Sequence, residues 1–334
     1  MSVSISRVVD VAGVELWHDV EERSVPFDHP GLLADPFEES LSMFREDQRT
    51  ERIVMFTAHD GDEVVGNEMI SYPLLDNLDN ALVHLTVVPE RRRRGVGRFL
   101  AGHLLDVARA EGRKRAMGWV ASPFDAEGPG LTFALGLGVT RANENVRREL
   151  DLEGLDDGTL DTVQRDLVGN RADRYQLVTW IDRAPDELVE TAARMMGRMS
   201  TDAPLGDSAW EPEAWDAARY REGEVAAASR RRRRLAAGAV DPNSSGLVAY
   251  TDIGVSTIRP EIAYQWDTVV DPDHRGHRLG LATKVENLRQ LRRESPESKR
   301  IETWNAASNS FMIAVNDALG FRPVERTTAV ELAL

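Results

Sequence analysis

The sequence predicts two tandem copies of one mixed α/β (α+β) fold, each with a mostly antiparallel sheet flanked by helices. The chain has 334 residues, about two domains at the usual ~100–200 residues each. An arginine- and glycine-rich loop occurs twice at a constant spacing, because Pro89 and Pro272 are 183 residues apart, as are Gly97 and Gly280. The flanking segments repeat in the same order, so we assign residues 1–165 to an N-terminal domain and 166–334 to a C-terminal domain.

The segments before each loop predict a short strand, then helices, then further strands. Helices are expected to begin near Asp35, Pro185 and Pro212, because a capping residue or a proline favours the first helical turn. The expected strands cover residues 3–9, 52–57 and 64–72 in the first copy, 176–181, 234–240 and 246–253 in the second, and two segments that end at Val87 and Val270.

The segments after each loop predict a helix and then a strand. Apolar residues recur at helical spacing after residue 96 and after residue 281, and Gly112 and Pro296 mark the two helix ends. Strands follow at 115–121 and 300–304. The polar stretch 156–173 contains glycines and an asparagine, so we expect the domain boundary there.

The composition excludes several classes of function. The chain has no cysteine, which removes disulfides, thiolate zinc sites and cysteine nucleophiles. Its histidines lack the HExxH spacing, so we expect no metal. A net charge of −15 argues against nucleic acid as a partner and favours cationic small molecules. There is no apolar run of ~20 residues and no secretory signal, so we expect no membrane association and a cytoplasmic location.

The repeated loop has the pattern Arg-x-x-Gly-x-Gly between a strand and a helix. Without side chains at the glycines, backbone N–H groups can turn toward one bound group, and the helix start adds a partial positive charge. The loop is therefore a candidate pyrophosphate site. An arginine run at the start of an exposed helix would look much the same.

In each copy, Val-x-Pro precedes the loop, and Leu-Gly-Val139 or Leu-Gly-Phe321 follows a later helix. With these motifs, each copy resembles the GNAT acyltransferase family. The resemblance implies acetyl-CoA as the acyl donor, with its pantetheine arm between two splayed strands and its pyrophosphate on the loop. The CoA-binding residues that it implies are Leu85, Thr86, Val87, Arg92, Arg93, Arg94, Gly95, Val96, Gly97, Thr268, Val269, Val270, Arg275, Gly276, His277, Arg278, Leu279, Gly280, Asn309 and Asn316.

The two copies depart from the family pattern in different ways. The second loop has Arg278 in place of the first glycine, a substitution that we expect to require a negative φ. In the last helix the family has an asparagine near the cofactor; the second copy keeps it as Asn309, whereas the first has Glu127. A carboxylate facing an anionic cofactor is unfavourable, so we expect catalysis in the C-terminal copy.

Amine acylation needs a base, which the family usually draws from the strand before the loop. Asp267 is the first candidate and Glu302, on the next strand, is the second; the alternative for Asp267 is a bond to nearby backbone. His84, which is 183 residues before Asp267, is the reserve candidate, although a strand histidine more often packs. The position of the family's usual acid, a tyrosine, holds Asn316 and, in the first copy, Ala134. Another group, Tyr264 or a water, therefore serves as the acid, or the thiolate leaves unassisted, or the copy is not catalytic.

The predicted function is acetyl-CoA-dependent N-acetylation of a small primary amine by a covalent pseudo-dimer. The alternatives are a non-catalytic CoA-binding tandem protein and a protein-lysine acetyltransferase. The arginine run 230–234 is interpreted as a solvated strand end, with an anchor for an acidic partner or a ribose phosphate as the alternative. Trp266 and Trp304 lie on the strands expected to border the acceptor site.

Overall fold

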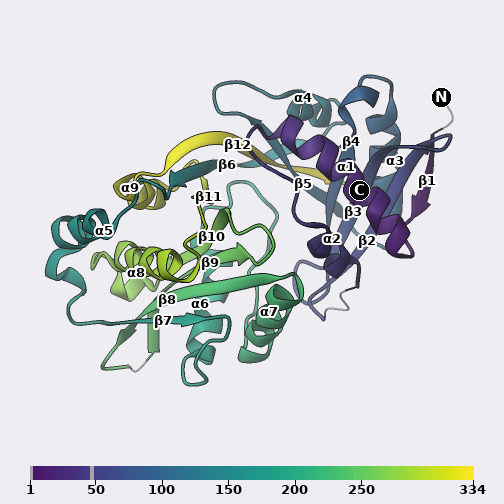
Figure 1. Ribbon diagram of the computed structural model, residues 1–334. Helices are drawn as coiled ribbons and strands as arrows, with labels where there is room; N and C mark the ends of the chain where they lie inside the picture. The colour runs from purple at the N-terminus through teal and green to yellow at the C-terminus, as the bar shows by residue number, and fades with distance from the viewer. Residues whose placement is uncertain (1–2, 46–48, 245) are drawn as a thin grey trace. The chain divides into compact units, whose positions relative to one another are not determined.

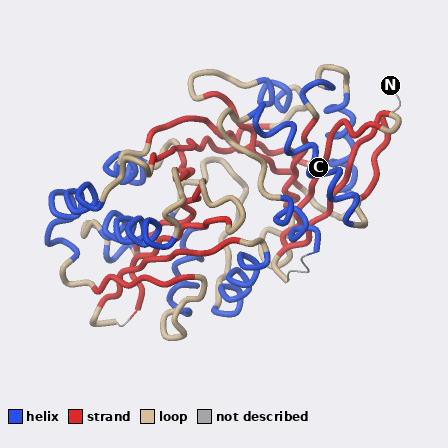
Figure 2. The backbone as a smooth tube through the Cα atoms, in the orientation of Figure 1, coloured by secondary structure: helices blue, strands red, loops and turns tan. Residues whose placement is uncertain are grey.

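The structure is a computed structural model that describes residues 3–45, 49–244 and 246–334. Two compact units are formed (Figure 1). Unit 1 comprises residues up to 144 together with 206–209 and 327–334, and unit 2 comprises 145–205 and 210–326. In both units, helices lie beside a sheet (Figure 2), as the sequence predicted.

The strands of unit 1 follow the order β1-β2-β3-β4-β5-β12. Neighbours from β1 to β4 pair antiparallel, whereas β4 and β5 pair parallel. The bounds are β1 Val3–Arg7, β2 Glu51–Asp60, β3 Glu63–Pro73, β4 Asn80–Val87, β5 Arg115–Pro123 and β12 Arg322–Ala333.

The helices of unit 1 cover both faces of its sheet. Helix α3 (Val96–Ala110) packs Leu104 against Phe56, whereas α1 (Val11–Asp28) packs Trp17 against Met55. Consecutive strand residues point to opposite faces, so the pair Met55 and Phe56 places these two helices on opposite sides. The remaining helices are α2 (Phe37–Arg45) and α4 (Pro129–Leu135).

The strands of unit 2 follow the order β6-β11-β10-β9-β8-β7, again with one parallel pair, β10 and β11. The bounds are β6 Thr140–Asp151, β7 Gln176–Ile181, β8 Arg232–Asp241, β9 Gly246–Ser256, β10 Ile262–Val270 and β11 Arg300–Ala306. Helix α8 (Leu279–Glu294) packs on the face that contains Ile253 and Ile301. Helices α6 (Val189–Asp202) and α7 (Ala217–Ser229) pack on the face that contains Tyr250. Helices α5 (Asp157–Val163) and α9 (Ser310–Leu319) complete the unit.

The chain exchanges strands between its two halves. The last residues of the chain belong to unit 1, where the Leu334 N–H donates to the Lys114 carbonyl at 2.9 Å. Conversely, residues 145–151 of β6 pair antiparallel with β11 in unit 2. We predicted a domain boundary at 165/166 from the sequence pattern, and that pattern carried no signal for this exchange.

Most predicted strands and both post-loop helices are confirmed, whereas some predicted helix starts are wrong. Helix α7 begins at Ala217 and not at Pro212, because the Asp216 side chain accepts the Arg219 N–H at 2.7 Å and caps the helix there. Helix α6 begins at Val189, after Pro185. The polar stretch 156–173 is largely helical, with Asp156 as its first cap. No helix in the described ranges has the length and apolarity that a bilayer crossing needs.

Candidate active site

Two loops with the same backbone conformation precede α3 and α8. Short 3₁₀ turns, Pro89–Arg91 and Pro272–His274, introduce them. Two positions in each loop have a positive φ. The first is Arg93 at 62° in unit 1 and Gly276 at 83° in unit 2; the second is Gly95 at 86° and Arg278 at 58°. The two loops therefore share one conformation, with the arginine and the glycine exchanged.

The expectation that Arg278 requires a negative φ is wrong. Its φ of 58° lies in the left-handed region, which costs an L-residue roughly 1–2 kcal/mol. Arg93 has the same strain at the other position of the first loop. Each loop thus keeps its shape with one strained arginine, so the missing glycine does not change the backbone at the helix start.

The helices that follow the loops begin without a side-chain cap. The N-cap residues are Gly95 for α3 and Arg278 for α8, and neither makes a side-chain hydrogen bond to its helix. The first N–H groups of a helix lack intrahelical partners and carry the positive end of the helix dipole. Both helix starts therefore fit an anionic group such as a pyrophosphate.

Arg92 and Arg275 brace the loops. The Nε of Arg92 donates to the Val87 carbonyl at 2.8 Å, and its two terminal nitrogens contact Asp28 at 2.5 and 2.7 Å. In unit 2, Nε of Arg275 donates to the Val270 carbonyl at 3.4 Å, and its Nη2 contacts Asp202 at 3.0 Å. Each arginine therefore ties the strand end to a helix of its own unit, α1 in unit 1 and α6 in unit 2.

The exposed arginines supply the free positive charge at each loop. Among the described residues, no hydrogen bond or ion pair engages the side chains of Arg93, Arg94 or Arg278. His277 is half-buried, and its ring lies 5.5 Å from the ring of Tyr175. The first loop thus presents more unpaired charge than the second.

The parallel strands next to each loop separate before they end. In unit 1 the pairing of β4 with β5 runs from Asn80 and Arg115 to Leu82 and Met117, and β4 then continues to Val87. Leu85, Thr86 and Val87 are paired with β3 on one edge. Their backbone groups that point away from β3 therefore face the space where β5 has diverged.

Unit 2 has the same separation of its parallel strands. The pairing of β10 with β11 runs from Ile262 and Arg300 to Gln265 and Thr303. Thr268, Val269 and Val270 continue β10 and pair with β9 on the other edge. A pantetheine arm, whose amides donate and accept hydrogen bonds, fits such an edge.

The two units differ where the helix after the loop faces the strand. A Cβ at Gly97 would lie 3.2 Å from the Phe133 ring, so this side chain of α4 rests directly on the first turn of α3. A Cβ at Gly280 would meet Val270 at 3.5 Å and Thr268 at 3.8 Å, and no residue of α9 within 4 Å. An aromatic ring therefore packs over the helix start in unit 1 and not in unit 2.

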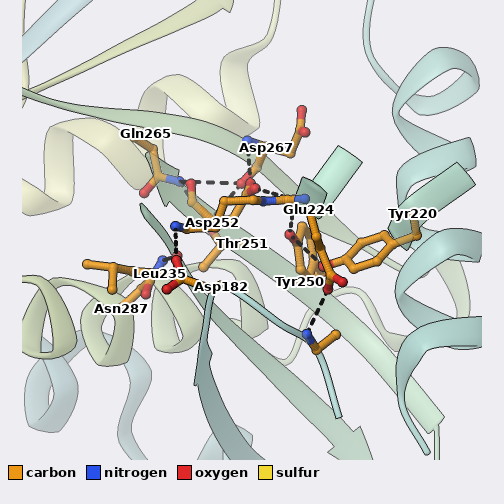
Figure 3. Close-up of polar contacts among 12 residues, drawn as sticks. Asp182, Tyr220, Glu224, Leu235, Tyr250, Thr251, Asp252, Gln265, Asp267 and Asn287 are labelled. Carbon is orange, nitrogen blue, oxygen red and sulfur yellow. Dashed lines mark hydrogen bonds and ion pairs between the residues drawn. The ribbon is translucent and has the colours of Figure 1, made fainter. Parts of the chain in front are cut away.

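Asp267 lies in a β-bulge of β10, opposite Asp252 (Figure 3). The Asp267 N–H donates to Asp252 Oδ1 at 3.0 Å, and the Asp267 carbonyl accepts from Thr251 Oγ1 at 2.9 Å. Its carboxyl group points away from this cluster and has no hydrogen-bond partner among the described residues. The alternative prediction of a carboxylate bonded to nearby backbone is therefore wrong.

The environment of Asp267 raises its pKa to about 7. Desolvation is the main cause, repulsion by the Asp252 carboxylate adds to it, and Arg234 opposes both. Glu213 contributes further repulsion. A carboxyl group that ionises near neutral pH can accept a proton from a substrate far better than an ordinary aspartate.

Arg234 is buried beneath Asp252. The interpretation of the run 230–234 as a solvated strand end is therefore wrong for Arg234. Its side chain is buried, with Nη2 at 2.7 Å from Asp252 Oδ2 and 2.9 Å from the Tyr250 hydroxyl. The Tyr250 hydroxyl is in turn 3.2 Å from that of Tyr220, on α7. The network fixes Asp252 and through it the bulge that carries Asp267.

The side chains of the other two predicted bases, Glu302 and His84, are engaged by charged neighbours. Glu302 is fully buried and forms ion pairs with Arg147 at 3.1 Å and Arg300 at 3.2 Å. His84, on β4 of unit 1, is exposed, and its Nε2 lies 3.3 Å from Glu21 Oε1, a carboxylate that raises the pKa of the imidazole. Unlike the carboxyl group of Asp267, the side chains of Glu302 and His84 therefore both have charged or hydrogen-bonding partners.

The residues that begin the last helix of each unit are also engaged. The Asn309 Oδ1 accepts the Met312 N–H at 3.1 Å and caps α9, and its amide nitrogen makes no hydrogen bond within the part of the chain that the structure describes. Glu127 forms an ion pair with Arg141, which neutralises the charge expected to disfavour an anionic cofactor in unit 1.

Asn316 is completely buried, and it is hydrogen-bonded to Lys284, a residue that the sequence analysis did not propose for the site. Lys284 Nζ donates to Asn316 Oδ1 at 2.8 Å, and Asn316 Nδ2 donates to Asn305 Oδ1 at 3.1 Å. The signal in the sequence was weak: Lys284 is one of only three lysines in the chain and interrupts the apolar stripe of its helix.

Aromatic side chains line the same face of unit 2 as Asp267. Tyr264 and Trp304 stack with ring centres 6.2 Å apart, and Trp304 is 41% exposed. Trp266 lies over Gly254, where it leaves no room for a Cβ. These rings form a surface on which an amine-bearing molecule could pack.

Comparisons with known proteins agree with this fold. Residues 16–126 match the model of the acetyltransferase (GNAT) family. A tandem GNAT protein from the clavulanic acid biosynthesis pathway, solved without AcCoA, is similar with a TM-score of 0.84 and 28% identity, over 99% of this chain and 98% of that one. No curated protein matches the chain in sequence.

Two more distant structures share the fold alone. A GCN5-related N-acetyltransferase from Sphaerobacter thermophilus has a TM-score of 0.65 and 13% identity, over 99% of this chain and 95% of that one. A glucosamine N-acetyltransferase region of a fungal GH3 β-N-acetylglucosaminidase has a TM-score of 0.70 and 12% identity, over 99% of this chain and 38% of that one.

Proposed function

We propose that this chain, which is similar to a tandem GNAT protein over nearly its whole length, acetylates a small primary amine with acetyl-CoA, and that unit 2 performs the reaction. The observation that carries the proposal is the Asp267 carboxyl group, unpartnered and beside the separated strands β10 and β11. When bound, acetyl-CoA supplies an activated acyl group and leaves as a thiol.

The loop and the strand edge of unit 2 can hold this donor. The free N–H groups at the start of α8 and the exposed Arg278 suit the pyrophosphate, while the open edge of β10 from Thr268 to Val270 suits the pantetheine amides. The amide nitrogen of Asn309 remains available at the start of α9.

Asp267 is the base in this proposal. An amine is mostly protonated at neutral pH and must lose a proton before or during its attack on the acyl carbon. The carboxylate of Asp267 accepts that proton, and its raised pKa makes it a stronger base than a solvated aspartate. The Trp304 and Tyr264 rings border the acceptor.

Unit 1 is proposed to have a supporting role. It has the same loop conformation, but Phe133 packs against the first turn of α3. We therefore assign no turnover to this unit.

The test is CoA release from acetyl-CoA with a panel of primary amines and polyamines, with Asp267→Asn compared with wild type. The matched control is Asp173→Asn, an exposed carboxylate of unit 2. The proposal predicts amine-dependent release that is lost in Asp267→Asn alone. Binding of acetyl-CoA with no release for any amine supports the non-catalytic alternative, and labelling of added protein supports the protein-lysine alternative.

A further inference from the structure

A buried lysine lies one helical turn beyond the loop of unit 2. Lys284 follows Gly280 by one turn of α8, so both residues lie on the same side of that helix. Its side chain is 1% exposed, and the ammonium donates to Asn316 Oδ1 at 2.8 Å. The Phe321 ring centre is 5.4 Å from Nζ.

Lys284 has no counter-ion among the described residues. On the elements packed around it, Asp317 of α9 is bound to Arg148 at 2.7 Å, and Glu302 of β11 is paired with Arg147. Burial lowers the pKa of Lys284 to about 7. A buried ammonium with only neutral partners is costly to retain in a core, where an apolar side chain would pack without penalty.

The hydrogen bonds of Lys284 lead to the point where the strands separate. Asn316 Nδ2 donates to Asn305 Oδ1, and Asn305 is on β11 just beyond Thr303, the last residue of β11 paired with β10. On the other side, the Gly280 turn faces Thr268 and Val270 of β10. The ammonium therefore lies between the start of α8 and the diverged end of β11.

We propose that Lys284 is the acid that protonates the departing thiolate in unit 2. This inference rests on the proposed function. In the step, the amine nitrogen bonds to the acyl carbon and the carbon–sulfur bond breaks. The sulfur takes a proton from the Lys284 ammonium, and Asp267 takes the proton that the amine loses. Solvent then returns a proton to the lysine and removes one from the aspartate.

Asn316 and Asn305 are positioning residues in this arrangement. The amide oxygen of Asn316 fixes the direction of the ammonium without the charge of a carboxylate, which would hold the proton more tightly. Asn305 in turn fixes Asn316. An acid with a pKa close to the working pH can both give its proton and regain it.

A direct test uses the small number of lysines, which are Lys114, Lys284 and Lys299. In protein labelled with ¹⁵N at Nζ, the Lys284 resonance is assigned by its loss in Lys284→Met. Titration is then followed in wild type alone, with CoA, and with desulfo-CoA. CoA is expected to shift the Lys284 resonance and raise its titration midpoint, because a nearby thiolate stabilises the ammonium, and desulfo-CoA is expected to do neither.

The outcomes separate the two claims. If CoA binds by calorimetry and the Lys284 resonance responds to it no more than to desulfo-CoA, the inference is overturned and the proposed function stands. If CoA does not bind at all, both are overturned.

Kinetics give a second readout. Lys284→Met is expected to lower kcat about 100-fold, the lower part of the ~10²–10⁴ range for general acids, with acetyl-CoA affinity little changed. The decline of kcat at alkaline pH should disappear with the lysine. Lys299→Met, at an exposed site, is the control that should behave as wild type. An unchanged kcat, or an alkaline decline that persists in Lys284→Met, would refute the role.

Discussion

Replacing Gly254 by alanine should destabilise unit 2 and displace the residue next to the proposed base. Gly254 lies on β9, opposite Tyr264 of β10. A Cβ at this position would be closer than 3.0 Å to three ring atoms of Trp266. Because the indole is a rigid part of the bulge that includes Asp267, the ring must move and the bulge must move with it.

The cost can be bounded from the contacts. Inserting one methyl into a packed site costs about 1–3 kcal/mol, and three simultaneous overlaps with a rigid ring favour the upper half of that range. For a unit of 150–250 residues this corresponds to roughly 2–4 °C of melting temperature per kcal/mol. Activity should fall by more than the loss of folded protein, because Asp267 is displaced.

The assay combines urea unfolding with CoA-release kinetics at a temperature where the variant is fully folded. The control is Gly102→Ala, an exposed position in α3 with no atom within 4 Å of the added methyl. That change should stabilise unit 1 by about 0.5–1 kcal/mol. A Gly254→Ala protein as stable and active as wild type would refute the packing of Trp266 against this strand.

Three further predictions follow from the same contacts. In wild type, kcat/KM should rise with pH up to about 7 as the Asp267 carboxyl loses its proton, and Asp267→Asn should remove that rise; a rise that survives would exclude this base. Because the folded pKa of Asp267 lies above its unfolded value, this group makes stability fall as pH increases from about 4 to 7, and the asparagine variant should lack that contribution in urea titrations. Arg234→Leu should cost about 3–5 kcal/mol by leaving Asp252 buried and unpaired, whereas the double variant with Asp252→Leu should recover much of the loss; equal losses would contradict the pairing. Phe133→Ala should add an acetyl-CoA site in unit 1, visible as increased stoichiometry, and an unchanged stoichiometry would show that the ring does not block it.

The sequence predicted the parts of the fold that depend on local pattern. The repeated loop located the strand ends at Val87 and Val270 and the helices after them, because glycine spacing and apolar periodicity are read within one element. It did not predict that β12 completes unit 1, since strand partners far apart in the chain leave no local signal.

The candidate site was predictable only in part, for a similar reason. Asp267 was chosen because it is the only carboxylate of its strand, but the bulge and the Asp252–Arg234 pair that perturb it depend on three strands together. Lys284 lay in a helical pattern with no sign of its partner Asn316, 32 residues away. Arg278 was misjudged because its backbone angle is set by the loop as a whole.

The central claim is that the working cofactor site belongs to unit 2, and calorimetric titration with acetyl-CoA tests it most directly. The measurement compares wild type with Gly97→Glu and Gly280→Glu, each of which brings a carboxylate to one helix start. The account predicts that binding survives in Gly97→Glu and is lost in Gly280→Glu. Binding that is lost in Gly97→Glu and kept in Gly280→Glu would place the site in unit 1 and contradict the assignment of Asp267 and Lys284.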